Sequence, residues 1–413
     1  MVQTIFILII AFIIAEFIFS RWLEWLNDKS WTDKIPAELE GLYDAEKYAK
    51  ARAYDREKGR LGLVSGSLSF VLILGMLLFH GFALIDDWAR TIAENETQVS
   101  LLFFAVLFIA SDIIGLPFSI YGIFVIEEKY GFNKMTWRTF IADKIKSYLL
   151  AIILGGGLIT LIIWFWNNTG EYFWLYAWVS LTVFTLFMSM FYTSTIMKLF
   201  NKFSPLPDGD LKTAINEYAA RIKFPLNNIK VMDGSKRSSK ANAFFTGLFG
   251  RKNIVLYDTL IEKNSTEELV AVLAHEVGHY KKKHVQQGMI ISVLYSGALL
   301  FLFGWLAKSH LLYEVLGASQ PGFHLAILTF SILYSPVSFV LGIAMNKLSR
   351  KNEYQADRFA KETYHAEPLI SALKKLSVDH LSNLSPHPLY VFFYYSHPTL
   401  LQRMRAMKSD LKM

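Results

Sequence analysis

The sequence predicts a mostly α-helical, polytopic membrane protein that carries one small α+β domain. Three observations predict this fold class. Hydrophobic residues make up 53% of the chain and the mean hydropathy is +0.31, a composition typical of membrane proteins. Seven apolar segments are each long enough to cross roughly 30 Å of hydrocarbon at 1.5 Å per residue. Residues 197–288 form a polar insert between the fifth and the sixth of them.

The first five spans lie within residues 1–196. No basic residue precedes the first span and no small-residue cleavage motif follows it, so we expect a retained helix and not a cleaved signal peptide. A charged cytoplasmic loop is expected at residues 21–60. Asp112 interrupts the third span, and a buried ionisable residue of this kind faces a cavity or a polar partner; a structural and a functional role are both open. The expected spans are residues 5–19, 61–85, 101–126, 148–166 and 172–196.

The insert at 197–288 has the pattern of a small soluble domain. Residues 203–209 are expected to form a turn, and Leu211, Ile215, Tyr218 and Ile222 then recur at helical spacing. Three strand-like runs, at 229–232, 243–248 and 254–257, are separated by polar or glycine-bearing turns. We therefore expect a small sheet followed by the helix that contains the motif described below.

Two further spans, residues 289–306 and 323–345, precede a helical C-terminal region at 346–413. Lys and Arg number nine in residues 21–60 and five in 127–147, whereas 86–100, 167–171 and 307–322 carry one, none and one. Because cytoplasmic loops carry the excess of basic residues, this pattern predicts an N terminus outside and an insert and C terminus in the cytoplasm. It also explains the net charge of +7 without nucleic acid.

The insert ends in an H-E-x-x-H motif, His275 to His279, on a predicted helix. Ser265 and Glu268 form a capping-box signature at the start of that helix. His275 and His279 lie one turn apart on the same face and can share one zinc ion, while Glu276 can reach a zinc-bound water. The chain contains no cysteine, so the remaining zinc ligand must be a histidine or a carboxylate.

The expected third ligand comes just after the seventh span. Glu353 and Asp357 are spaced i and i+4 on a predicted helix, so one carboxylate can bind the metal while the other holds an imidazole N–H. An ordinary acidic pair on a solvated helix face is the competing interpretation. His284, five residues after His279, is expected to point away from the metal and to lie on the surface.

Together these motifs make the chain resemble the CAAX prenyl protease 1 family of seven-helix membrane zinc metalloproteases. The resemblance implies that seven helices enclose a chamber, that His275, His279 and Glu353 bind one zinc ion, and that Glu276 is the base. The motifs are IEEKYGFN at 126–133, FNKFSPLPDG at 200–209, SSKANAFF at 238–245, HEVGH at 275–279, NEYQAD at 352–357 and SHPTLLQR at 396–403.

The same resemblance assigns roles around the metal. It implies that Asp357 supports His275, that Asn242 contacts the substrate backbone at a sheet edge, and that His397 and Arg403 lie against the site. We expect His397 to hydrogen-bond the oxyanion of the reaction and Arg403 to bind substrate.

The expected function is therefore a membrane-embedded zinc metalloendopeptidase that cuts near the C termini of proteins or peptides, prenylated or not. Two alternatives stay open: a general quality-control protease for membrane proteins, and a non-catalytic channel or scaffold. Lipid bilayer and substrate tails are the expected partners, with no obligate protein partner. The short segment at 307–322 and the absence of a retrieval signal at 410–413 suggest a bacterial inner membrane, with the endoplasmic reticulum expected for a eukaryotic protein.

Overall fold

The structure, a computed structural model, describes residues 1–32, 35–41, 43–224, 226, 228–246 and 253–409. Within this part of the chain, seven helical segments are long and apolar enough to cross a membrane, which confirms the predicted fold class. A π-helical turn at Gly122–Glu127 extends the third of these segments, and a second π-helical turn at Ala151–Gly156 lies in the middle of the fourth. The spans are formed by α1 (Val2–Ser30), α2 (Ala45–Leu78), α4 (Glu96–Tyr121), α5 (Trp137–Leu150) with α6 (Gly157–Asn168), α7 (Phe173–Phe191), α12 (His284–Leu306) and α14 (Phe323–Thr363).

The first two helices differ from the predicted boundaries. Much of the charged loop expected at 21–60 is helical, because α1 continues to Ser30 and α2 begins at Ala45, where the Asp44 side chain accepts a hydrogen bond from the Lys47 N–H. The span expected to reach residue 85 ends at Leu78. His80 adopts a left-handed conformation with φ 54°, and a separate helix, α3 (Gly81–Ile92), follows. Hydropathy marks where a helix meets lipid, but it does not mark where the helix ends.

The insert contains a four-stranded sheet with the order β1-β2-β4-β3. β2 and β4 are parallel, and the two outer pairs are antiparallel. β1 lies where a turn was expected, and residues 247–248 of the expected second strand fall outside the described residues. The elements are α8 (Ile196–Phe200), β1 (Phe203–Pro205), α9 (Asp210–Arg221), β2 (Asn228–Met232), β3 (Ala243–Thr246), β4 (Asn253–Tyr257), α10 (Asp258–Lys263) and α11 (Thr266–Lys281).

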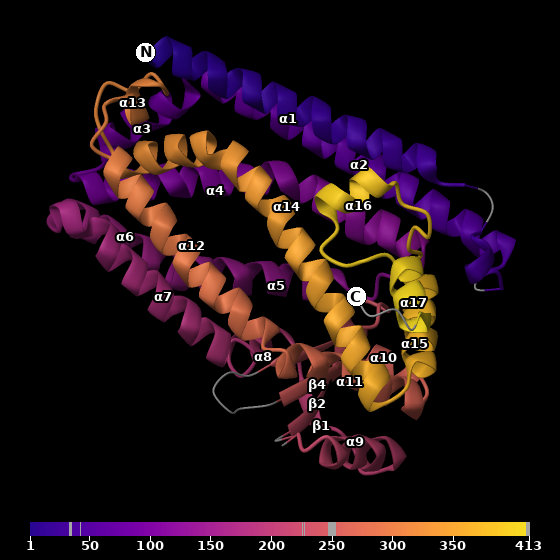
Figure 1. Cartoon of the computed structure of the whole chain (residues 1–413). Coiled ribbons are helices and arrows are strands. Elements are labelled where there is room, and N and C mark those ends of the chain that lie inside the picture. The colour runs from indigo at the N-terminus through magenta and orange to yellow at the C-terminus, as the bar shows by residue number, and fades with distance from the viewer. Residues whose placement is uncertain (33–34, 42, 225, 227, 247–252, 410–413) are drawn as a thin grey trace.

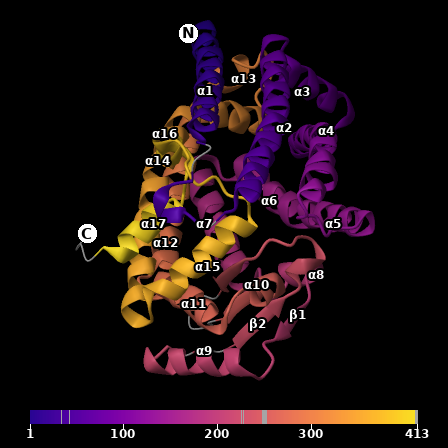
Figure 2. The same ribbon diagram turned by 90° about the vertical axis from the view of Figure 1, so that its right-hand side faces the viewer.

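The sheet and α9 lie at one end of the molecule, and the N terminus lies at the other end with α3 and α13 (Figures 1 and 2). Helix α11 runs through the core at the sheet end, where Val270, Leu273, Ala274 and Val277 are almost completely buried. Helices α9, α14 and α15 pack around it. The remaining helices are α13 (Leu311–Glu314), α15 (Ala366–Asp379), α16 (Pro388–Tyr394) and α17 (Leu400–Lys408), with short 3-10 turns at Ala37–Leu39, Gly170–Tyr172 and Gly234–Lys236.

Helices α11 and α14 approach each other closely at Gly278. A Cβ atom at this position would lie 3.0 Å from the Cα and 3.1 Å from the carbonyl oxygen of Ala356, so a side chain there would push the two backbones apart. Because Gly278 and Ala356 are both small, the backbones of the two helices can lie this close together. The contact holds the turn of α14 that carries Glu353 and Asp357 beside the motif on α11.

Asp112, the ionisable residue of the third span, has polar partners in the structure. Its Oδ1 lies 2.5 Å from the Lys144 Nζ, and the Tyr148 hydroxyl donates to its Oδ2. The carboxylate is thus compensated by groups on α5. These contacts favour the structural role among the two that the sequence left open.

Candidate metal centre

The helix that carries the motif is fixed firmly at its start. Ser265 and Glu268 form the predicted capping box: the Ser265 hydroxyl accepts from the Glu268 N–H, and Glu268 Oε2 accepts from the Ser265 N–H at 2.8 Å. Glu268 also accepts from the Ser371 hydroxyl at 2.6 Å and from Lys375 Nζ at 2.7 Å, both on α15. Burial raises the pKa of Glu268, but these donors outweigh that effect and hold the pKa below 4.5. The charged carboxylate therefore ties α11 to α15.

His275, His279 and Glu353 converge at the centre of the site. One ligand atom from each lies within 4.8 Å of the others. The Nε2 atoms of the two histidines are 3.2 Å apart, Glu353 Oε1 is 3.2 Å from His279 Nε2, and Glu353 Oε2 is 3.5 Å from His275 Nε2. A tetrahedral ion with bonds of about 2.0–2.1 Å separates its ligand atoms by roughly 3.3–3.4 Å. The three side chains are thus spaced as ligands of one small metal ion.

The hydrogen bonding of Glu353 agrees with such a ligand set. Its Oε2 is buried and accepts no hydrogen bond from the residues that the structure describes. Its nearest cationic groups are Arg403 Nη1 at 3.4 Å and His275 Nε2 at 3.5 Å, and a metal ion would add a short contact that neither of them makes. The residues present therefore fit a divalent metal ion.

Asp357 and Arg403 lie behind His275, on the side away from this centre. Asp357 Oδ1 is 2.9 Å from His275 Nδ1, and Arg403 holds both oxygens of Asp357 through its Nε at 2.8 Å and its Nη2 at 2.5 Å. Burial and the Arg403 charge lower the pKa of His275, but the hydrogen bonds that its ring donates to Asp357 and Glu353 outweigh them and raise this pKa to about 9. The surroundings of His275 thus favour a cation, whether a proton or a metal ion.

Arg403 was expected to bind substrate, but its contacts point to another task. Only 8% of the residue is exposed, and its Nη1 lies 3.4 Å from Glu353 Oε2 while its other nitrogens contact Asp357. The guanidinium is therefore engaged by two carboxylates at the base of the site.

His284 contradicts the sequence-based expectation of a surface position. It is 8% exposed, and its Nδ1 lies 3.1 Å from His279 Nδ1. The expectation was wrong because it continued one helix through both histidines. Helix α11 ends at Lys281, Lys283 takes a left-handed conformation with φ 60°, and α12 starts at His284. No residue in this stretch is a glycine or proline that would have signalled the break.

The metal-binding group faces an open pocket of about 940 Å³. Glu276, Asn242 and His397 also line it. Burial raises the pKa of Glu276, although the neighbouring His275 and His279 oppose this effect. A carboxylate whose pKa is raised in this way is better suited to accept a proton near neutral pH.

His397 and Asn242 both line this pocket. His397 precedes α17, its side chain is 63% exposed, and its Nε2 is 3.4 Å from Glu353 Oε1. Asn242 immediately precedes β3, the edge strand of the sheet, and its carbonyl accepts from the Tyr257 N–H at 3.0 Å. The lining of the pocket thus includes the residue that precedes an edge strand and an exposed imidazole.

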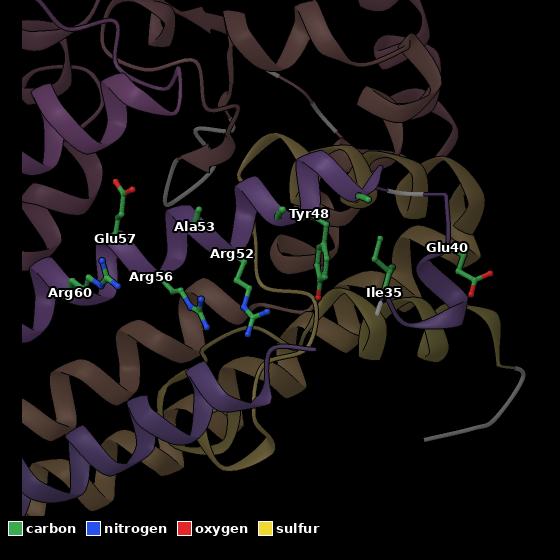
Figure 3. Close-up of a pocket in the computed structure, with 10 residues that line it drawn as sticks. Ile35, Glu40, Tyr48, Arg52, Ala53, Arg56, Glu57 and Arg60 are labelled. Atoms are coloured by element: carbon green, nitrogen blue, oxygen red, sulfur yellow. The ribbon is translucent and has the colours of Figure 1, made fainter. Parts of the chain in front are cut away.

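A second pocket of about 720 Å³ lies along the first half of α2 (Figure 3). Arg52, Arg56 and Arg60 follow one another at four-residue spacing and so share one face of the helix. Arg56 Nε is 3.3 Å from Asp28 on α1. This pocket contains none of the residues expected in the metal centre.

Two family models together match most of the chain. Residues 24–202 match a model described as CAAX prenyl protease N-terminal, five membrane helices, and residues 205–410 match Peptidase family M48. The chain is 36% identical to the CAAX prenyl protease 1 homolog of Oryza sativa, covering 97% of this chain and 96% of the relative. It is 36% identical to CAAX prenyl protease 1 of Saccharomyces cerevisiae, with 97% and 94% covered, and 35% identical to the Homo sapiens homolog, with 92% and 89% covered.

A solved structure is similar over almost the whole length. The crystal structure of S. mikatae Ste24p superposes with a TM-score of 0.92 at 36% sequence identity. The match covers 98% of this chain and 99% of that one. The likeness therefore extends over the membrane helices and the domain that contains the sheet.

Proposed function

Because the chain belongs to the CAAX prenyl protease 1 family, and is a membrane-embedded metalloendopeptidase of that type, we propose that it uses one zinc ion to cut CAAX-type proteins or peptides near their C termini. One observation supports this function most directly. His275, His279 and Glu353 are spaced for a tetrahedral ion, with Glu276 beside them in an open pocket. Catalytic zinc sites commonly have three protein ligands of this type and one open position.

When bound, zinc would supply Lewis-acid chemistry, lowering the pKa of a water and polarising the scissile carbonyl. Glu276, beside the three ligand residues, would accept a proton from the attacking water and deliver it to the leaving amine. The pKa of Glu276, raised by burial, suits this task because the side chain must both take and return a proton.

Two further residues act on the substrate in this proposal. The edge strand β3 begins at Ala243, directly after Asn242, and can pair with an extended peptide by main-chain hydrogen bonds. His397 hydrogen-bonds the oxyanion that forms at the scissile carbonyl, a contact worth about 2.7–4 kcal/mol where one donor has been removed. Its exposed imidazole, which lines the same pocket 3.4 Å from Glu353 Oε1, supports this role.

We also propose a cytoplasmic position for the metal centre and the C terminus, on the basis of the basic residues in the loops on that side. The zinc helix α11 is followed directly by the membrane helix α12, and Glu353 lies near the end of α14, itself a candidate span. Substrate would thus meet the zinc close to the membrane surface. The relatives come from plants, yeast and mammals, and they lend no support to the expected bacterial inner membrane.

The test is product mapping on a farnesylated C-terminal peptide beside its unprenylated twin, with Glu276→Ala as the inactive control. Both peptides should be cut near their C termini, and the farnesylated one faster, because the lipid raises its concentration at the membrane. The proposal fails if a stably folded soluble protein is cut internally while both short peptides stay intact.

A further inference from the structure

We propose that His284 and Gln355 form a hydrogen-bond relay that orients the His279 imidazole for the metal ion. This inference rests on the proposed zinc site and assigns two positioning residues to it. Neither residue contacts the metal-binding atoms of the other two ligands; both act through the far nitrogen of His279.

The relay follows from the hydrogen-bonding capacity of each group. Gln355 Oε1 is 2.8 Å from His284 Nε2, and an amide oxygen only accepts, so His284 Nε2 carries the proton. A neutral imidazole then has an acceptor at its other nitrogen. His284 Nδ1 lies 3.1 Å from His279 Nδ1 and accepts its N–H. His279 Nε2 is left with a free lone pair, and it is this atom that lies 3.2 Å from Glu353 Oε1.

The two metal-binding histidines are thus anchored by different groups. His275 Nδ1 faces a carboxylate, Asp357, at 2.9 Å, which is the partner that metal-binding histidines often have. His279 has a neutral imidazole in the same place. Glu353, Gln355 and Asp357 occupy three alternate positions of α14, so one short segment supplies a ligand, the anchor of His275 and the acceptor that holds His284.

Burial and backbone geometry hold the relay together. His284 is 8% exposed and its ring centroid lies 5.1 Å from that of His279. The left-handed Lys283 turns the chain between α11 and α12, and this turn returns His284 to the metal-binding helix. A non-glycine residue in that conformation is strained, and the contacts of His284 help to hold it there.

Zinc affinity, measured by competition with a chromogenic chelator on the full-length protein in detergent, tests the relay. His284→Phe keeps the ring and removes both nitrogens, and Gln355→Leu keeps the size and removes the acceptor. Each should weaken zinc binding roughly 10–100-fold, as for other groups that hold metal ligands. The double variant should bind zinc about as tightly as His284→Phe, because Gln355 acts only through His284.

Two controls separate this role from a general structural one. His284→Asn offers an amide oxygen near the position of Nδ1 and should recover part of the affinity, whereas Gln286→Leu, an exposed amide on α12, should leave it unchanged. The melting temperatures of the metal-free variants identify any loss of fold. Additive losses in the double variant, or wild-type affinity in His284→Phe, would overturn the relay. A wild-type protein that binds no zinc would instead overturn the proposed function.

Discussion

Arg403 and Asp357, 46 residues apart in the chain, form a two-pronged ion pair directly behind His275. Both groups are almost completely buried, at 8% and 1% exposed. The pair joins α17 to α14 and places a fixed negative charge against the Nδ1 of His275. Arg403 therefore acts on the metal centre through the residues that hold it.

Replacing Arg403 by Gln should destabilise the metal-free protein and weaken zinc binding. Removing one partner of a buried ion pair costs about 3–5 kcal/mol of unfolding free energy, because the other charge stays buried and unpaired. Thermal unfolding and chelator competition measure the two effects. A variant with normal stability and zinc content but a raised KM would restore the substrate-binding role expected from the sequence.

Replacing Glu276 by Gln should keep the metal and abolish turnover. The ligand atoms come from His275, His279 and Glu353, whereas Glu276 lines the pocket beside them and handles the proton. Metal analysis and peptide hydrolysis on the same sample check the prediction. Loss of zinc from this variant would make Glu276 a ligand and not a base.

Replacing Glu353 by Ala should remove both zinc and activity, whereas Asp357→Asn should weaken zinc affinity by roughly 10–100-fold and retain a loaded enzyme at high zinc. The difference follows from their positions, since Glu353 contributes a ligand atom and Asp357 contacts the far nitrogen of His275. Zinc titration of both variants is the measurement. Normal zinc content in Glu353→Ala would rule out the third ligand.

Replacing His397 by Ala should lower kcat much more than it raises KM. An oxyanion contact strengthens only in the transition state, and the exposed His397 imidazole lies at the rim of the pocket. Steady-state kinetics on a short peptide separates the two parameters. An increase in KM at unchanged kcat would assign His397 to ground-state binding.

Glu268 should make the stability of the fold depend on pH. Its folded-state pKa lies below 4.5, so its contribution is complete above that pH and is lost as the pH falls through the lowered folded value. Glu268→Gln should therefore unfold at a lower temperature than wild type at pH 7, because the amide keeps the capping-box acceptor but loses the negative charge that pairs with Lys375 Nζ at 2.7 Å. The gap between the two melting temperatures should narrow below pH 4.5. A gap that is constant down to pH 3 would contradict the charged role.

Much of the fold could be read from the sequence because it depends on local patterns. The number of spans follows from apolar length, and the start of α11 follows from Ser265 and Glu268, three residues apart. The ends of the helices are harder to predict from the sequence. Neither the charged continuation of α1 nor the break at His80 can be recognised from hydropathy. The sequence predicts a turn where β1 lies, because the three residues of β1 acquire strand geometry only by pairing with β2.

The sequence by itself determined that two histidines share one face of a helix with a glutamate next to them, and that an acidic pair, Glu353 and Asp357, follows the last predicted span. Tertiary structure decided what surrounds them. The close contact between Gly278 and Ala356 brings α14 against α11, and the break at Lys283 turns His284 back onto His279. Such contacts depend on how separate helices pack and on a single backbone torsion, and neither property leaves a periodic pattern in the chain.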